Sequence, residues 1–383
     1  MSEATLKNLR ILELNAGIAG AYCAKILAQR GAEVIKLEAP GSKFNGSAEN
    51  LYLDTAKKSI TINLRNEMGI GMFQRLVSMT DVLIEGCNPS EKSEIGLDAN
   101  SLTQNNPRLV ITSVTGFGQT GPYSNYKDTP MVSYAMGGQM YLCGDAEGTP
   151  LNSGLAVSEY ISGLYAFTGT LLALEAREKN GRGQQVDISK MECLAASHQY
   201  TLTWPEYSNS ILSRPGWPGD HAPQSLFRCK DGYVNLRLQN ADIAFLSYLF
   251  DMPEVASDER FAATHERANH MKELEKLITD KIINIGKKDV FRKAGEWREI
   301  CGFVATPADL LTNEQYNERE YWTKINHGMT GVMSYSGMPA KMSESAWLSS
   351  GAPLPGENNQ EIYCDRLGLT WQELKQMQEW SVI

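Results

Sequence analysis

One carboxylate, Glu159, stands at the predicted start of a helix, just before the small and apolar residues Ser162, Gly163 and Leu164. In the first turn of a helix an acidic side chain complements the positive end of the helix dipole, which is the simplest interpretation of its position. The same carboxylate could act as a covalent nucleophile, aided by backbone N–H groups of the helix start and by the nearby glycines. Spacing alone does not choose between these two roles.

A glycine-rich segment, residues 116–121 (GFGQTG), has the G-x-G-x-x-G spacing of dinucleotide-binding loops and follows a predicted strand over residues 109–114. A dinucleotide site needs a helix directly after these glycines, because the helix N-terminus binds the pyrophosphate. Here Pro122 and a polar run follow, which predicts a loop. The segment therefore does not indicate a nicotinamide-dependent dehydrogenase.

The composition argues against several classes of protein. The formal net charge is −9, whereas nucleic-acid binding requires a basic surface. Seven cysteines occur without a C-x-x-C pair and five histidines occur without metal-ligand spacing, so we expect reduced thiols and no metal site. Apolar runs such as residues 163–174 are shorter than the roughly 20 residues of a membrane span. With no secretory signal at the N-terminus, we expect a cytoplasmic protein that binds neither nucleic acid nor membrane.

Strand and helix patterns alternate along the first half of the chain. The patterns predict strands over residues 10–14, 33–37, 59–64, 81–85, 109–114 and 184–188, and helices over residues 20–30, 68–77, 157–180 and 191–200. Strands that alternate with helices form a parallel sheet with helices on both faces. The predicted fold class is therefore α/β, with a Rossmann-like doubly wound parallel sheet in a large domain.

With 383 residues, the chain exceeds the roughly 250–300 residues at which single cores usually split into domains. Pro, Gly and Trp concentrate between residues 204 and 222, which is typical of a linker. We predict a large domain over residues 1–205, a linker over 206–225 and a smaller α+β domain over 226–310. The smaller domain is expected to contain a hairpin turning at Asp231-Gly232, followed by mostly helical residues.

Six segments, in order, resemble the family III CoA-transferases of the carnitine and formyl-CoA type, also called the CaiB/BaiF family. They are residues 6–41, 55–66, 105–125, 173–193, 227–236 and 352–369. The resemblance implies an interlocked homodimer, with residues 311–383 returning to the large domain. It also implies an acyl-CoA and a small carboxylic acid as substrates. In the family an aspartate attacks the acyl-CoA, giving a mixed anhydride and then an enzyme-bound CoA thioester.

The resemblance carries site residues over to this chain. Glu159 occupies the position of the family's nucleophilic aspartate, which is a departure from the pattern. The implied positions for binding coenzyme A are Ile18, Ala19, Ile62, Arg65, Gly86, Cys87, Lys92 and Lys127. Basic residues common in the family are replaced at Ala39, Asn88 and Glu94, and losing such phosphate contacts weakens binding of an anionic ligand. Lys36 is a further candidate for a phosphate contact. For each of these basic residues, the ordinary interpretation is a solvated side chain on the surface.

Three functions remain open from the sequence. The first is an active CoA-transferase with Glu159 as nucleophile. The second is a silent subunit that forms a hetero-oligomer with an active relative, which the missing basic residues favour. The third is the related acyl-CoA racemase chemistry, in which Lys127 would stand where a histidine base is needed and Glu159 where its aspartate partner is needed. The sequence does not name the acyl group or the acceptor acid.

Overall fold

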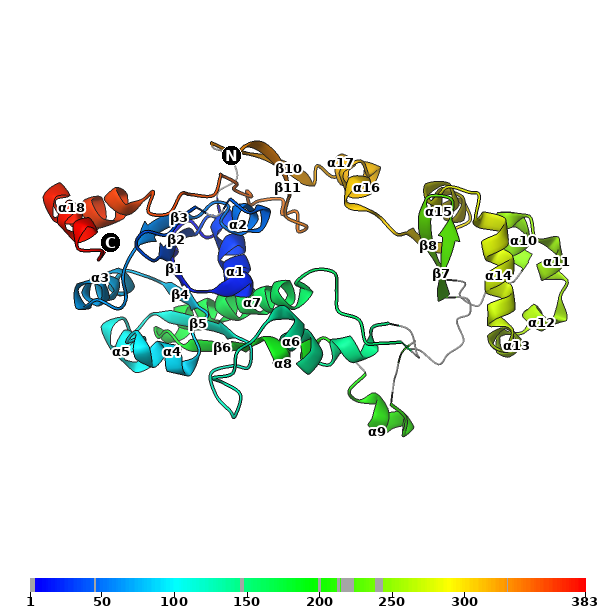
Figure 1. The fold of residues 1–383 in the computed structure, drawn as a ribbon, viewed down its shortest axis with the longest axis horizontal. Coiled ribbons are helices and arrows are strands. Elements are labelled where there is room, and N and C mark those ends of the chain that lie inside the picture. Colours follow the sequence, from blue (N-terminus) through cyan, green and yellow to red (C-terminus); the bar gives the residue numbers. More distant parts are fainter. Residues whose placement is uncertain are drawn as a thin grey trace. The chain divides into compact units, whose positions relative to one another are not determined.

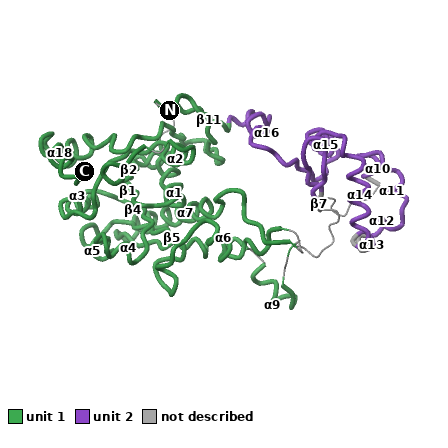
Figure 2. Tube along the Cα trace, in the orientation of Figure 1, with its two compact units in different colours: residues 1–216, 321–383 green, residues 217–320 purple. Residues whose placement is uncertain are grey.

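The computed structural model describes residues 4–44, 46–144, 148–198, 201–211, 214, 224–237, 244–328 and 330–383. Two compact units divide the chain, one formed by residues 1–216 with 321–383 and the other by residues 217–320 (Figure 2). Of the predicted linker, residues 212, 213 and 215–223 lie outside the described residues. The domain bounds derived from the sequence stay a prediction.

A six-stranded sheet forms the centre of the first unit, with strand order β3-β2-β1-β4-β5-β6 (Figure 1). Every neighbouring pair in this sheet is parallel. The strands are β1 (Arg10–Leu14), β2 (Glu33–Glu38), β3 (Lys58–Thr61), β4 (Val82–Glu85), β5 (Val110–Thr115) and β6 (Gln185–Ser189). All residues of β4 and β5 are buried, as expected for strands covered on both faces. The predicted α/β class with a doubly wound parallel sheet is confirmed.

Helices cover both faces of the sheet. On one face α1 (Gly17–Gln29) and α7 (Val157–Asn180) pack in a core with alternate sheet residues such as Ile11 and Val34. On the other face α3 (Glu67–Ser78), the π-helical segment η2 (Gln360–Arg366) and α18 (Trp371–Glu379) pack with the intervening residues, such as Leu12 and Ile35. Opposite faces take alternate residues because side chains along a strand point alternately up and down.

Shorter elements complete the first unit. They are α2 (Ala48–Leu53), α4 (Pro89–Glu94), α5 (Ala99–Asn105), α6 (Pro130–Met136), η1 (Gln139–Leu142), α8 (Lys190–Ala196), α9 (Trp204–Ser208) and the antiparallel pair β10 (Trp322–His327) and β11 (Gly331–Ser336). The C-terminal segment is tied to the sheet by polar contacts. The Tyr363 hydroxyl donates to the carbonyl of Thr61 at 2.7 Å, and the Asn359 amide donates to the Thr61 hydroxyl at 2.8 Å.

The second unit has its own antiparallel sheet and core. Strands β7 (Gln224–Cys229), β8 (Gly232–Arg237) and β9 (Ile300–Phe303) pair in that order. Its helices are α10 (Ala244–Phe250), α11 (Pro253–Ala256), α12 (Glu259–Ala262), α13 (Thr264–Asn269), α14 (Met271–Ile282), α15 (Lys287–Glu296), α16 (Pro307–Leu311) and α17 (Glu314–Glu318). The predicted hairpin is confirmed, and Gly232 at its turn has a φ of 153°.

Most predicted elements of the first unit agree with the structure to within a few residues. Helix α7 has the predicted bounds and ends at Gly181, whose left-handed φ of 76° stops the helix. Helix α1 begins at Gly17 rather than Gly20, and α8 ends at Ala196 rather than continuing to Tyr200, which lies outside the described residues. The errors are at helix ends, where caps and tertiary contacts decide the boundary.

Candidate functional site

The carboxyl ends of β1 and β4 meet where the strand order of the parallel sheet reverses, which is the usual place for a ligand in such folds. After β1 the chain turns into α1 at Gly17, which has a φ of 57°. After β4 comes Gly86, and a Cβ atom there would lie 2.4 Å from the carbonyl oxygen of Asn15. Only glycine allows these two turns to pack so closely, so Gly86 fixes the start of α1 against β4.

Glu159 lies in the first turn of α7, and only 3% of its side chain is exposed. Its carboxylate contacts two residues outside α7, Ala19 and Lys190. Oε2 accepts a hydrogen bond from the backbone N–H of Ala19 at 3.2 Å, and Oε1 accepts one from Lys190 Nζ at 2.8 Å. Ala19 belongs to the first turn of α1, where N–H groups lack partners within the helix and bind anions readily. The carboxylate is therefore held at the N-terminus of a second helix.

Lys190 connects Glu159 with a second carboxylate. Lys190 Nζ also lies 3.2 Å from Asp128 Oδ2, and Asp128 Oδ1 accepts a hydrogen bond from Ser133 Oγ at 2.8 Å. The side chain of Asp128 is 9% exposed and that of Lys190 is 14% exposed. Two carboxylates and one ammonium thus share a site with little access to water.

Sequence reasoning missed both Lys190 and Asp128. Lys190 did carry a usable signal, because it directly follows a strand of the parallel sheet and so lies at the same edge as Glu159. Asp128 lies between β5 and α6 in a segment without periodicity, and no pattern in the sequence marks it.

A close helix crossing brings Ala19 to Glu159. A Cβ atom at Gly163 of α7 would lie 2.7 Å from the carbonyl oxygen of Ala19. The rings of Tyr22 on α1 and Tyr160 on α7 pack edge to face beside this crossing, with centroids 4.9 Å apart. The small residue at position 163 therefore sets how near the two helices come.

The structure brings together some of the predicted coenzyme A positions. Ile18 and Ala19 lie in the first turn of α1, and Gly86 and Cys87 follow β4 at the neighbouring strand end. Ile62 follows β3 on the other side of β2, and its side chain is buried in the core. The Ile62 N–H also donates to the carbonyl of Glu38 at 2.8 Å, so neither its side chain nor its N–H is open to a ligand at this edge.

The predicted basic contacts fall into two groups. Lys92 Nζ lies 2.7 Å from Glu85 Oε1 and 3.0 Å from Ser113 Oγ, and Lys36 Nζ lies 2.7 Å from Asp54 Oδ2. These two ammonium groups are already neutralised by carboxylates. Arg65 and Lys127 are exposed instead.

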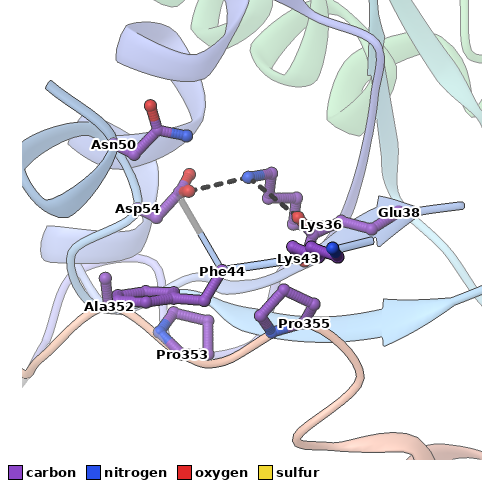
Figure 3. A pocket seen from close by; sticks show the side chains of 9 residues that line it. All are labelled: Lys36, Glu38, Lys43, Phe44, Asn50, Asp54, Ala352, Pro353 and Pro355. Carbon is purple, nitrogen blue, oxygen red and sulfur yellow. Dashed lines mark hydrogen bonds and ion pairs between the residues drawn. The ribbon is translucent and has the colours of Figure 1, made fainter. Parts of the chain in front are cut away.

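A cavity of about 310 Å³ opens beside the start of α1, lined by residues of β1, β2 and α2 together with Gly17 and Ile18. The adjoining pocket in Figure 3 shares Lys36 and Asp54 with it and has walls formed by Phe44 and Pro353, among other residues. In this view the Lys36 ammonium points between the carboxylates of Asp54 and Glu38, at 2.7 Å and 3.3 Å.

A buried ion pair underlies this cavity. Lys57 Nζ lies 2.6 Å from Glu13 Oε2 and 3.3 Å from Asp54 Oδ1, and it donates to the carbonyl of Ala21 at 3.1 Å. Burial raises the pKa of Glu13, although the Lys57 ammonium opposes the shift. Asp54 therefore links Lys57 and Lys36 in one network of charges under the cavity.

Neither a metal site nor a membrane span is present among the residues that the structure describes. No group of three or more His, Cys, Asp or Glu side chains in them is arranged to hold a metal ion. Within the same ranges, no helix is both long and apolar enough to pass through a membrane.

Residues 6–359 match the family model described as CoA-transferase family III. The chain belongs to this family. It is similar to the succinyl-CoA–D-citramalate CoA-transferase of Chloroflexus aurantiacus, with 31% identity covering 99% of this chain and 98% of the relative. It is also similar to the formyl-CoA:oxalate CoA-transferase of Streptomyces coelicolor, with 28% identity covering 100% of both chains.

A solved structure agrees with the family assignment. The crystal structure of a CaiB/BaiF family protein from Brucella suis has a TM-score of 0.87 and 28% identity to this chain, covering 95% of this chain and 100% of that one. The predicted family, fold class and enzyme class are confirmed. This family III CoA-transferase moves CoA between an acyl-CoA and a carboxylic acid.

Proposed function

We propose that this CoA-transferase uses Glu159 as the covalent nucleophile of the exchange. The observation that carries the proposal is the buried carboxylate of Glu159, with one oxygen held by the Ala19 N–H and the other by Lys190. Two anchors restrict a side chain that has three rotatable bonds, and a nucleophile must be held close to its attack geometry. A first-turn acid acting on the dipole of its own helix would need neither anchor.

The exchange balances through four displacements. Glu159 attacks the acyl carbonyl carbon, the carbon–sulfur bond breaks with its electron pair leaving on CoA, and an acyl–glutamyl anhydride remains. The CoA thiolate then attacks the glutamyl carbon and releases the donor acid as its carboxylate, which leaves a glutamyl–CoA thioester. The acceptor carboxylate repeats the two steps in reverse. No ATP is required, because each step exchanges one activated acyl bond for another.

The positions implied for coenzyme A support a binding path along the carboxyl ends of the strands. Ile18, Ala19, Gly86 and Cys87 lie beside the reversal point of the sheet, next to the anchored Glu159. With Lys36 and Lys92 paired to carboxylates, we propose that Arg65 and Lys127 contact the phosphates, since both are exposed. An interlocked homodimer and a cytoplasmic location stay predictions.

Mass spectrometry of the covalent intermediate tests the proposal. The protein is incubated with succinyl-CoA, formyl-CoA and other acyl-CoAs, and the thioester is trapped with borohydride or hydroxylamine. Before trapping we expect a CoA-sized adduct on the peptide containing Glu159, and after trapping the alcohol or hydroxamate that forms when CoA is released. Both should be absent in Glu159→Gln. Glu175→Gln is the matched control, because Glu175 is on the same helix but has a 65% exposed side chain.

The absence of an adduct on Glu159 would favour one of the two other functions. If no donor gives an adduct and calorimetry detects no CoA binding, Glu159 is not the nucleophile, and a silent subunit paired with an active relative becomes the better description. Racemase chemistry is tested by deuterium exchange at the α-carbon of the acyl group. The ammonium that contacts Glu159 belongs to Lys190 and not to Lys127, which gives the racemase arrangement no support.

A further inference from the structure

Lys190 contacts the proposed nucleophile but has no assigned task in the exchange. It begins α8 directly after β6, and the preceding Ser189 caps this helix by accepting a hydrogen bond from the N–H of Glu192. Its position is therefore set by the backbone of β6, the strand at one edge of the parallel sheet. From there its ammonium reaches Glu159 Oε1 at 2.8 Å and Asp128 Oδ2 at 3.2 Å.

Asp128 is held in place independently of Lys190. Its Oδ1 accepts a hydrogen bond from Ser133 Oγ at 2.8 Å, and Ser133 is itself fully buried in α6. The segment also packs closely on Gly116, where a Cβ atom would lie 2.4 Å from the Asp128 Cβ. Asp128 is thus a fixed negative charge next to Lys190, whatever the state of Glu159.

The covalent steps change the charge of this site. When Glu159 becomes an anhydride, its carboxylate charge is lost and the electron pair of the broken carbon–sulfur bond leaves with CoA. When the thioester then forms, the negative charge leaves with the carboxylate of the donor acid. A buried ammonium that loses its only counter-ion is strongly unfavourable. Lys190 keeps a counter-ion through these stages because Asp128 is still 3.2 Å away.

We infer that Lys190 is a positioning residue for Glu159 and that Asp128 is the permanent counter-ion that keeps Lys190 paired and in place while Glu159 is acylated. The inference rests on the proposed role of Glu159 as nucleophile and goes further, since it assigns separate tasks to Lys190 and Asp128. It also accounts for the glutamate: the two anchors hold the longer side chain that replaces the aspartate implied by the family resemblance.

Opposite effects on the covalent equilibrium follow from these two tasks. Removing the Lys190 charge leaves the free Glu159 carboxylate without its counter-ion beside Asp128, so the neutral acylated state is favoured. Removing the Asp128 charge leaves Lys190 unpaired only in the acylated state, so that state is disfavoured. We expect the equilibrium constant for the glutamyl–CoA thioester to rise about tenfold in Lys190→Met and to fall about tenfold in Asp128→Asn.

The experiment uses the full-length protein with succinyl-CoA and succinate at fixed ratios, and the fraction of thioester is read by intact-protein mass spectrometry. The rate of thioester formation in a single turnover is measured alongside. We expect Lys190→Met to slow this step about a hundredfold through loss of positioning, and Lys190→Arg to recover most of the rate. Lys179→Met is the matched control, because Lys179 has a 75% exposed side chain at the far end of α7.

If Lys190 and Asp128 only supported the fold, both variants would form the thioester more slowly, but their thioester equilibrium constants would not shift in opposite directions. The inference is overturned if both equilibrium constants stay within twofold of the wild type, or if both shift in the same direction. If succinyl-CoA gives no thioester in the wild type, the donor from the mass-spectrometry panel that does is used instead.

A measurement without substrate separates this inference from the proposed function. The carboxylate stretch of Glu159 is obtained by isotope-edited infrared difference spectroscopy of the ¹³C-glutamate-labelled protein against Glu159→Gln. We expect this band to shift in Lys190→Met and to return in Lys190→Arg. If no acyl-CoA modifies Glu159, the proposed nucleophile fails, and an unshifted band in Lys190→Met would then refute the positioning role as well.

Discussion

Replacing Gly163 by alanine tests how the crossing of α1 and α7 supports the site. The added Cβ would lie 2.7 Å from the Ala19 carbonyl oxygen, whereas ordinary contact begins at 3.4 Å, so the helices must separate by about 0.7 Å. Overpacking of this kind costs about 1–3 kcal/mol. The hydrogen bond from the Ala19 N–H to Glu159 is already 3.2 Å long, and the same separation would break it.

Two measurements on Gly163→Ala follow from this geometry. Urea unfolding should show a loss of about 1–3 kcal/mol relative to Gly71→Ala, a control in α3 whose added Cβ meets nothing within 4 Å. The comparison cancels the helix propensity that alanine gains in both variants. The turnover number should fall by about a hundredfold, because Glu159 loses one of its two anchors.

Either result can refute the reasoning on its own. If Gly163→Ala is as stable as Gly71→Ala, the two helices do not approach each other as closely as the structure has them. If it is destabilised but keeps full activity with the donor found by mass spectrometry, the N–H of Ala19 is not needed to place Glu159.

Three further predictions concern charged side chains. Arg366, together with Lys58, lowers the pKa of Glu33 from 4.5 to about 2, so its contribution to stability is complete above pH 4.5 and is lost as the pH falls towards 2. In Arg366→Met, the free energy of unfolding measured with urea should therefore fall less steeply between pH 4.5 and pH 2 than in the wild type. The same dependence on pH in both proteins would contradict this. Lys57→Met should cost about 3–5 kcal/mol, because it leaves the buried carboxylate of Glu13 unpaired, and Glu13→Gln added to it should restore part of the loss. Glu159→Asp should lower the turnover number about a hundredfold, and full activity would show that the anchors of the longer side chain are not needed.

The fold was largely predictable because its signals are local. Apolar alternation marked β1, and the long helical pattern of α7 ended at a glycine that the structure places in the left-handed region. Helix α1 was predicted to begin three residues late, because Gly17 starts it with a φ of 57°, and no periodicity reports such a turn. Ends of elements depend on contacts with other segments, and those contacts are not local.

The site was predictable only in part, for the same reason. The resemblance placed Glu159 at the nucleophile position, but its contact with Lys190 joins residues 31 positions apart and depends on how α7 lies against β6. Likewise, nothing in the spacing of Lys36 and Lys92 shows that Asp54 and Glu85 neutralise them. The sequence identifies candidate charges, whereas their partners follow from the fold.

The glutamate at position 159 and the lysine at position 190 are best understood as one feature. An aspartate at 159 would end about 1.5 Å short of both anchors, beyond hydrogen-bonding reach of the Ala19 N–H, which is already 3.2 Å from the glutamate oxygen. Without Lys190, the longer side chain would have one anchor for three rotatable bonds. Because each residue makes sense only with the other present, the departure from the family's aspartate argues for a rebuilt site, and the missing phosphate contacts at positions 39, 88 and 94 do not by themselves indicate a silent subunit.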